Sequence, residues 1–342
     1  MTKLPDWWAP GCYEVAPGVY RIPLALPNDA LRAVNVYAIE TTRGLVLIDG
    51  GWRVPATVGE LDAALRSVGH AVDEVTEVLV THIHRDHYTL AIELRRRVGS
   101  RVYLGQAEAP GLRAVRALGS NVPVSSIREL VRAGANGLVE VVVALTEQEA
   151  FDAADWEDPD GWLTPGPLEV GTRRLEVVAT PGHTKGHVVF HDVEAELMFT
   201  GDHVLPTITP SIGFELGDWG RPLSNYLDSL SLMTARPDAV LLPAHGHHGG
   251  SLHERVTVLL DHHEHRLEEI LRSVRRLGGS VTGAAIAAEL LWTRRGRAFE
   301  SLDPFNRMIA VCETMAHLDV LADRGAVEVT THAERPVVSF AG

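Results

Sequence analysis

The stretch Thr81-His82-Ile83-His84-Arg85-Asp86-His87 places three imidazoles and one carboxylate within seven residues. It follows the apolar run Val78-Leu79-Val80, which predicts a buried strand with the polar side chains on the loop at its end. Neutral imidazole and carboxylate suit zinc and related divalent metals. In an extended loop His82 and His84 point to the same side, whereas the adjacent Asp86 and His87 diverge. The motif therefore favours two metal centres over one.

Four further residues of ligand type occur elsewhere in the chain, each just after a predicted apolar strand: Asp49, His183, Asp202 and His245. Each lies beside glycine, a residue typical of turns, so each is expected on a loop at a strand end. Sheets commonly present functional side chains at such ends. The series predicts that these loops meet at one edge of the fold.

With these motifs in this order, the chain resembles the metallo-β-lactamase superfamily, in its glyoxalase II-like or lactamase-beta-like branch, over roughly residues 15–250. The resemblance implies an α+β fold, a four-layer αββα sandwich of two mixed sheets with helices outside. It also implies a complete ligand set. One metal would be bound by His82, His84 and His183 and a second by Asp86, His87 and His245, with Asp202 bridging them and Asp49 orienting a ligand. The implied cofactors are two Zn²⁺ ions, although iron and manganese accept the same ligands.

The reaction implied by this ligand set is hydrolysis. A hydroxide shared by the two metals would attack the carbonyl of a small ester, thioester or lactone. Asp86 is expected to help aim the hydroxide, and Tyr88 either donates to a developing oxyanion or packs at the start of a helix. The carboxylate at Asp202 is shared with thioesterases, lactonases and nucleases of this resemblance and argues against a β-lactam hydrolase. An endoribonuclease and a protein with purely structural metals are the open alternatives.

Composition predicts a large core and an acidic surface. The chain has 342 residues, of which 45% are hydrophobic, and a net charge of -14. An acidic chain is poorly suited to a phosphate backbone, so a small-molecule substrate is expected rather than nucleic acid. Cys12 and Cys312 are expected to be free thiols in a reducing cytosol. Residues 1–10 lack a signal-peptide pattern and no apolar run of about 18 residues occurs, which predicts a cytoplasmic enzyme without a membrane span.

The chain is expected to form two domains, a catalytic one over 1–252 and a small, mainly helical one over 253–342. Residues 106–165 depart from the strand–helix rhythm and are interpreted as an insertion or lid at the site. In the second domain we expect helices over 253–276, 281–292 and about 303–324, then strands at 327–329 and 337–340. This order resembles the winged-helix tail of lactamase-beta-like hydrolases, whose human member is an endoribonuclease. Because acidic residues outnumber basic ones here, we expect a packing role or a homodimer contact rather than nucleic-acid binding.

Two groups of side chains have an ambiguous role in the sequence. Aromatic residues of the insertion and of the segment after the bridging carboxylate either line a substrate pocket or pack against the sheets: Phe151, Trp156, Trp162, Phe214 and Trp219. Three histidines of the first C-terminal helix, His262, His263 and His265, are expected on its solvent-exposed surface beside several glutamates.

Overall fold

Two β-sheets lie face to face in the computed structural model, which describes residues 6–27, 31–214, 220–293, 295–331 and 337–342. The first sheet has the order β1-β2-β3-β4-β5-β6-β7 and the second the order β12-β11-β10-β9-β8. Their strands are β1 (Tyr13–Ala16), β2 (Val19–Ala25), β3 (Ala33–Thr41), β4 (Gly44–Ile48), β5 (Val75–Val80), β6 (Arg101–Gly105), β7 (Gly161–Leu163), β8 (Gly166–Val170), β9 (Arg173–Ala179), β10 (Val188–Asp192), β11 (Leu197–Gly201) and β12 (Val240–Pro243).

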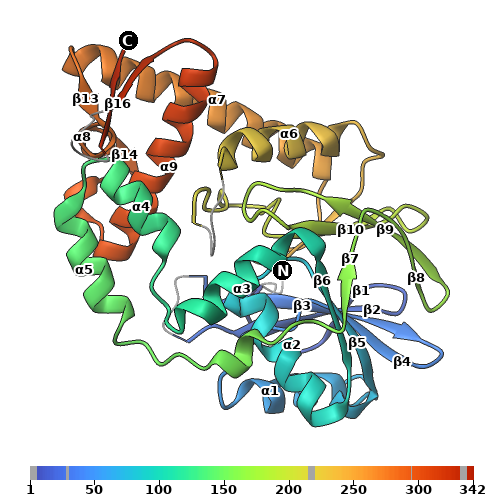
Figure 1. Cartoon of the computed structure of the whole chain (residues 1–342). Coiled ribbons are helices and arrows are strands. Elements are labelled where there is room, and N and C mark those ends of the chain that lie inside the picture. The colour runs from blue at the N-terminus through green and yellow to red at the C-terminus, as the bar shows by residue number, and fades with distance from the viewer. Residues whose placement is uncertain (1–5, 28–30, 215–219, 294, 332–336) are drawn as a thin grey trace.

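Helices cover the outer face of each sheet (Figure 1). The helices α1 (Thr57–Arg66), α2 (Arg85–Val98) and α3 (Ala109–Leu118) lie on the side of the first sheet, and α6 (Pro222–Thr234) and α7 (Leu252–Leu277) lie on the side of the second. The α+β, four-layer αββα sandwich expected from the sequence is confirmed.

The side chains of a strand point alternately to the two faces of its sheet, and this divides the apolar core into separate clusters. In β4, Leu45 and Leu47 pack under the helices of the first sheet, whereas Val46 and Ile48 belong to the cluster between the two sheets. Successive strand side chains point to opposite faces, so a strand covered on both sides reads as one continuous apolar run. A third cluster lies between the second sheet, α6, α7 and the C-terminal elements.

The register of the first sheet brings its ligand loops to one edge. β4, β5 and β6 are parallel, with Ile48 opposite Leu79, so their carboxyl ends share an edge. The N–H of Asp49 donates to the carbonyl of Leu79 (2.9 Å), which continues the pairing one residue beyond β4. Asp49 and the loop that starts at Thr81 therefore lie side by side.

The C-terminal region contains the elements expected there, with one exception. α7 is followed by α8 (Gly283–Glu289), α9 (Pro304–Asp323) and a sheet of order β13-β17-β16, formed by Val281–Thr282, Val338–Ala341 and Glu328–Thr331. The oxygens of Thr282 and Asp303 cap α8 and α9 by accepting from the N–H of Ala285 (3.3 Å) and Asn306 (3.0 Å).

The helix expected over 281–292 was too long at both ends. β13 occupies its first two residues, and β14 (Leu291–Trp292) pairs with β15 (Arg297–Ala298) after it ends. Tertiary strand pairing outweighs helix propensity at these ends.

Two helices from residues 106–165 pack on the C-terminal region. These helices are α4 (Val124–Arg132) and α5 (Asn136–Thr146). Leu130, Ala133 and Val142 are buried in the same apolar cluster as Met315 of α9. In Figure 1 α4 and α5, in green, lie against α9, in red-orange.

Two expectations about individual side chains have different outcomes. The thiols of Cys12 and Cys312 are free, as expected. The expectation that His263 lies on the surface was wrong, because this side chain is only 1% exposed and faces His317 of α9. It lies on the stripe of α7 that also carries Val256 and Leu267, which helical periodicity places inside.

Among the helices of the described ranges, none is both long enough and apolar enough to cross a membrane.

Candidate metal centre

The loop after β5 delivers the first ligand candidates and then turns directly into α2. His84 occupies the position before the first residue of α2, and the N–H of His87 donates to the carbonyl of His84 (3.0 Å). Asp86 therefore lies in the first helical turn, where a carboxylate is favoured by the helix dipole. The side chains of Asp86 and His87 nevertheless converge, with Oδ2 of Asp86 3.6 Å from Nε2 of His87, so the divergence expected from the sequence motif is wrong.

Three imidazoles converge at the first position of the cluster. The Nδ1 of His84 lies 3.1 Å from Nε2 of His82 and 2.9 Å from Nε2 of His183. His183 comes from the turn between β9 and β10, far away in the sequence. These three nitrogens are close enough together to ligate one ion.

A second group contains both imidazole and carboxylate. The Oδ2 of Asp86 lies 3.6 Å from Nε2 of His87 and 3.4 Å from Nε2 of His245. Asp202 lies between the two groups: its Oδ1 is 3.3 Å from Nε2 of His245, and its Oδ2 is 3.5 Å from Nε2 of His183. The structure thus brings all seven predicted ligands together, with Asp202 in contact with both groups.

Asp49 contacts the His87 ring at Nδ1, the nitrogen that faces away from the cluster. Its Oδ2 lies 2.9 Å from Nδ1 of His87, and its Oδ1 accepts from the N–H (2.8 Å) and the hydroxyl (2.9 Å) of Thr81. Asp49 has a φ of 63°, in the left-handed region that aspartate tolerates better than most residues. This backbone turn aims the carboxylate back at the cluster, and the remote nitrogen of His87 is thereby fixed.

The remote nitrogens of the other ligand candidates are held in the same way. Nδ1 of His245 donates to the carbonyl of Ala33 (2.8 Å) and Nδ1 of His183 to the carbonyl of Ser211 (2.9 Å). Nδ1 of His82 lies 3.0 Å from the Thr81 hydroxyl. A proton on each Nδ1 leaves Nε2 unprotonated toward the cluster, as metal ligation requires. Sequence analysis missed these partners, because backbone carbonyls carry no sequence signal.

Burial and charge divide the histidines into two classes. Burial lowers the pKa of His82 well below its usual range, that of His84 to about 3, and that of His183. Burial also opposes the charged form of His87, but Asp49, Asp86 and Asp202 outweigh it and raise the pKa of His87 to about 9. The pKa of His245 is likewise raised, chiefly by Asp202 against the effect of burial.

The carboxylates respond in the opposite sense. Burial favours their neutral form, but neighbouring imidazoles, His87 for Asp86 and His245 for Asp202, hold the pKa of each below its usual range. The cluster therefore contains two carboxylates that need positive charge beside them. A divalent cation held by these residues would supply this charge in place of the protons of His87 and His245.

Buried ligand-type atoms without hydrogen bonds are a separate observation that fits a pair of divalent ions. Within the described residues, Nε2 of His87, Nε2 of His245 and Oδ1 of Asp202 are buried and make no hydrogen bond. Buried polar atoms without partners are rare and need an explanation such as an ion. All three point into the cluster, so bound cations would satisfy them.

Tyr88 does not occupy the predicted oxyanion position. Its hydroxyl donates to the carbonyl of Glu157, and its ring is fully buried in the core between the first sheet and its helices. The packing alternative is therefore the one that this geometry supports. The reason is helical periodicity, since Tyr88 follows His87 by about 100° around α2 and so faces another side.

The aromatic candidates separate by location. Trp156 is 7% exposed and packs in the core of the first sheet, whereas Trp162 is 38% exposed. Phe151 is partly buried against the same core as Trp156. Phe214 is in contact with a ligand candidate, with its ring centroid 5.5 Å from that of His84. Trp219 lies outside the described residues.

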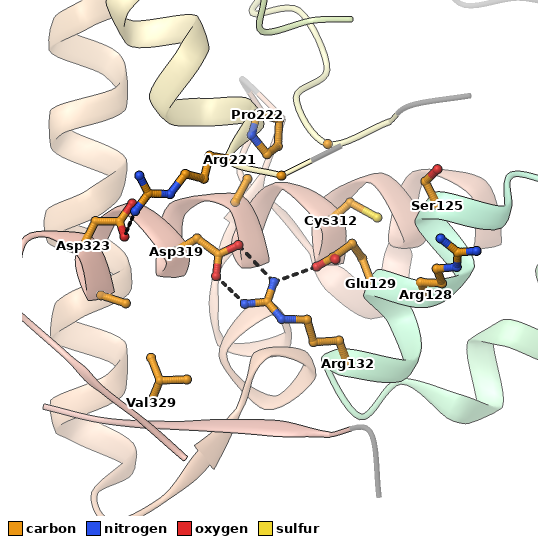
Figure 2. A pocket seen from close by; sticks show the side chains of 14 residues that line it. Ser125, Arg128, Glu129, Arg132, Arg221, Pro222, Cys312, Asp319, Asp323 and Val329 are labelled. Carbon is orange, nitrogen blue, oxygen red and sulfur yellow. Dashed lines mark hydrogen bonds and ion pairs between the residues drawn. The ribbon is translucent and has the colours of Figure 1, made fainter. Parts of the chain in front are cut away.

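Two cavities with charged walls lie in the described part of the chain, and neither is lined by a ligand candidate. One, of about 440 Å³, lies between α4, α9 and the segment that contains Gly213, the residue before Phe214. Figure 2 shows Arg132 between Glu129 and Asp319, with Nη1 of Arg132 3.0 Å and 2.9 Å from these carboxylates. The other, of about 470 Å³, is lined by Arg85, Trp52 and several acidic residues of the insertion. Neither wall is suited to a purely apolar ligand.

Comparison with known proteins identifies the family of this arrangement. Residues 29–245 match the metallo-beta-lactamase superfamily, a span that contains all seven ligand candidates. The chain is similar to a metallo-beta-lactamase family protein from Thermus thermophilus (TM-score 0.72, 27% identity, covering 96% of this chain and 99% of that one). It is also similar to a beta-lactamase domain protein from Burkholderia ambifaria (TM-score 0.74, 25% identity, covering 99% and 97%).

Curated relatives match over a smaller share of the two chains. Lactamase-like protein nscB of Neosartorya fischeri is 26% identical over 70% of this chain, and the match spans only 56% of that relative. Hydroxyacylglutathione hydrolase GloC of Haemophilus influenzae is 23% identical over 55% of this chain and 76% of its own length. An atrochrysone carboxyl ACP thioesterase of Aspergillus fumigatus is 23% identical over 82% of this chain and 56% of its own length. Because the family match covers more than half of the chain and includes the whole ligand set, the chain belongs to the metallo-beta-lactamase superfamily.

Proposed function

We propose that the chain is a dinuclear metal-dependent hydrolase of a small, polar ester, thioester or lactone, with two Zn²⁺ ions as its cofactors. The observation that carries the proposal is the buried cluster in which two groups of ligand-type atoms share Asp202. Two relatives bear names that describe hydrolysis of thioesters, GloC and the ACP thioesterase, which supports the same chemistry here.

The residues of the cluster have separable roles in this proposal. His82, His84 and His183 would hold one ion, and Asp86, His87 and His245 the other, with Asp202 between them. When bound, such ions lower the pKa of water to about 7 and polarise a carbonyl oxygen. Asp86 is the less buried of the two carboxylates of the cluster, with 18% of its side chain exposed against 10% for Asp202. It is therefore the group best placed to accept a proton from an attacking water.

Charge pairing beside the cavity between α4 and α9, and at the end of α9, supports a small-molecule substrate over nucleic acid. Arg132 is paired with Asp319, Arg221 with Asp323, and Arg324 with Glu264 (2.7 Å). Paired arginines contribute little to the release of counterions that drives phosphate-backbone binding. This observation does not favour the endoribonuclease alternative, and we do not propose it.

A substrate panel tests the proposal directly. Purified protein loaded with Zn²⁺ is assayed on acyl thioesters, aryl esters, lactones, a β-lactam and single-stranded RNA, before and after treatment with a chelator. We expect turnover of at least one carbonyl ester, thioester or lactone that is lost with the chelator and restored by Zn²⁺. RNA cleavage alone, or activity indifferent to chelator, would overturn the proposal.

A further inference from the structure

A buried carboxylate outside the ligand set joins the two loops that carry the first group of imidazoles. Glu108 ends the short helix Gln106–Glu108 after β6, and its side chain is 0% exposed. Its Oε1 accepts from the hydroxyl of Thr184 and from the N–H of Ile83 (3.4 Å). Nothing in the sequence motifs pointed to this residue, because it lies at the start of the insertion.

The positions of its two partners give this contact its significance. Ile83 lies between His82 and His84, and Thr184 directly follows His183. One carboxylate oxygen therefore fixes the separation of the two loops that supply all three imidazoles of the first group. In the second group, Asp86 and His87 lie in the first turn of α2, and His245 follows β12.

Two glycines allow the segment that contains Glu108 to approach the loop of His183 closely. A Cβ at Gly186 would lie 2.3 Å from the backbone nitrogen of Glu108 and 2.5 Å from its Cγ. A Cβ at Gly105 would lie 2.2 Å from the carbonyl oxygen of Gly186. Only glycine permits these contacts, so the Glu108 segment and the His183 loop are in direct backbone contact.

We propose that Glu108 is a positioning residue for the first metal group, acting through Ile83 and Thr184 on His82, His84 and His183. The inference rests on the proposed dinuclear function. Without the carboxylate, a buried N–H and a buried hydroxyl lose their acceptor, and the two loops lose the contact that holds their imidazoles at ligand distance. Loss of a residue that supports metal ligands in this way typically lowers metal affinity about 10- to 100-fold.

The test measures metal affinity separately from activity. Glu108→Leu removes the acceptor, Glu108→Gln retains an oxygen at the same place, and Thr184→Val removes one donor without changing the shape. Each full-length variant is dialysed against graded chelator and analysed for zinc per chain, and the cobalt(II)-loaded form is followed by its absorption spectrum. Asp192→Asn is the matched control, since Asp192 is a buried carboxylate at the opposite end of β10, paired with Arg173 (2.7 Å).

We expect Glu108→Leu to lose one of two zinc ions at about 10- to 100-fold lower chelator strength than the parent, with an altered cobalt spectrum. Thr184→Val should show a smaller loss of the same ion, while Glu108→Gln recovers most of the affinity and Asp192→Asn retains both ions. If Glu108→Leu does not fold, Thr184→Val and Glu108→Gln carry the test. Retention of both ions in Thr184→Val and Glu108→Leu, or equal weakening of both ions, overturns the inference. A parent protein that binds two ions but hydrolyses nothing would instead overturn the proposed function.

Discussion

Buried histidines meet in two regions of this protein, and their surroundings differ. At the sheet edge, Nε2 of His87 lies 3.6 Å from Asp86 and 3.8 Å from Asp202. Between α7 and α9, Nδ1 of His263 lies 3.1 Å from Nε2 of His317, and Nδ1 of His317 donates to the carbonyl of Glu313 (2.7 Å). The first region surrounds imidazoles with carboxylates, whereas the second links two imidazoles to a backbone acceptor.

This difference shows why burial of histidine alone does not make a metal site. Burial lowers the pKa of His317 to about 3 and that of His263 as well, so the pair between the helices is neutral, although Nε2 of His263 is buried without a hydrogen bond. The carboxylates of the sheet edge instead require positive charge, and the buried polar atoms there face a common centre. We therefore expect mutations at the sheet edge to change metal binding, and mutations between α7 and α9 to change stability without changing metal content.

The largest effect is expected at the carboxylate that both metal groups share. Asp202→Asn removes the charge between them, so we expect loss of at least one zinc ion and a fall in kcat on the order of 10³-fold, similar to other losses of a central electrostatic group. Metal analysis and steady-state kinetics on the best substrate of the panel measure both. The comparison fails if Asp202→Asn keeps two ions and more than a tenth of the activity.

A smaller effect on the same region is expected from Asp49. Asp49→Asn retains an oxygen but removes the charge that faces Nδ1 of His87 at 2.9 Å. We expect affinity for the ion held by His87 to fall about 10- to 100-fold, with the fold intact. Competition with a zinc indicator measures it, and an unchanged affinity would show that Asp49 acts only through Thr81.

The helix pair should respond in stability but not in metal content. His317→Leu removes the acceptor of the buried N–H of His263, which costs about 1–3 kcal/mol of unfolding free energy. Urea unfolding of the zinc-loaded protein measures this change, and zinc per chain should remain that of the parent. Loss of zinc in this variant would show that the two regions are coupled and would remove the distinction between them.

The pH dependence of stability gives the smallest and most specific contrast. The pKa of His317 is about 3 in the folded chain, below the usual value of about 6.5 in an unfolded one. The unfolded chain therefore takes up a proton first, so the stability contributed by the neutral ring is present above pH 6.5 or so and is lost as the pH falls toward 3. Unfolding free energies from pH 7 to pH 5 should fall less steeply in His317→Leu than in the parent. Equal slopes would show that the ring titrates alike in both states.

Much of the fold follows from local patterns. Apolar runs that end in glycine and ligand-type residues predicted the strands and loops that now share one edge, as with Asp49 and His82. Thr282 and Asp303 cap α8 and α9, and such caps are local because the side chain accepts from an N–H three residues later. The seven ligand candidates come from the same reasoning together with a family resemblance, and they lie in one cluster. The identity of the ions they bind stays a prediction.

Other features depend on contacts between segments that are distant in the chain. The sequence determined which residues stand at strand ends, because alternation and turn chemistry are local properties. Tertiary packing alone brings Tyr88 to Glu157, buries His263 against His317, and places Glu108 between the loops of His82 and His183. The orientations of the His245 and His183 rings likewise come from the backbone carbonyls of Ala33 and Ser211, which any side chain at those positions would leave in place. The physical reason is that hydrogen-bond partners and burial are set by the packing of whole layers, and a local pattern of residues contains no information about which layer will lie opposite.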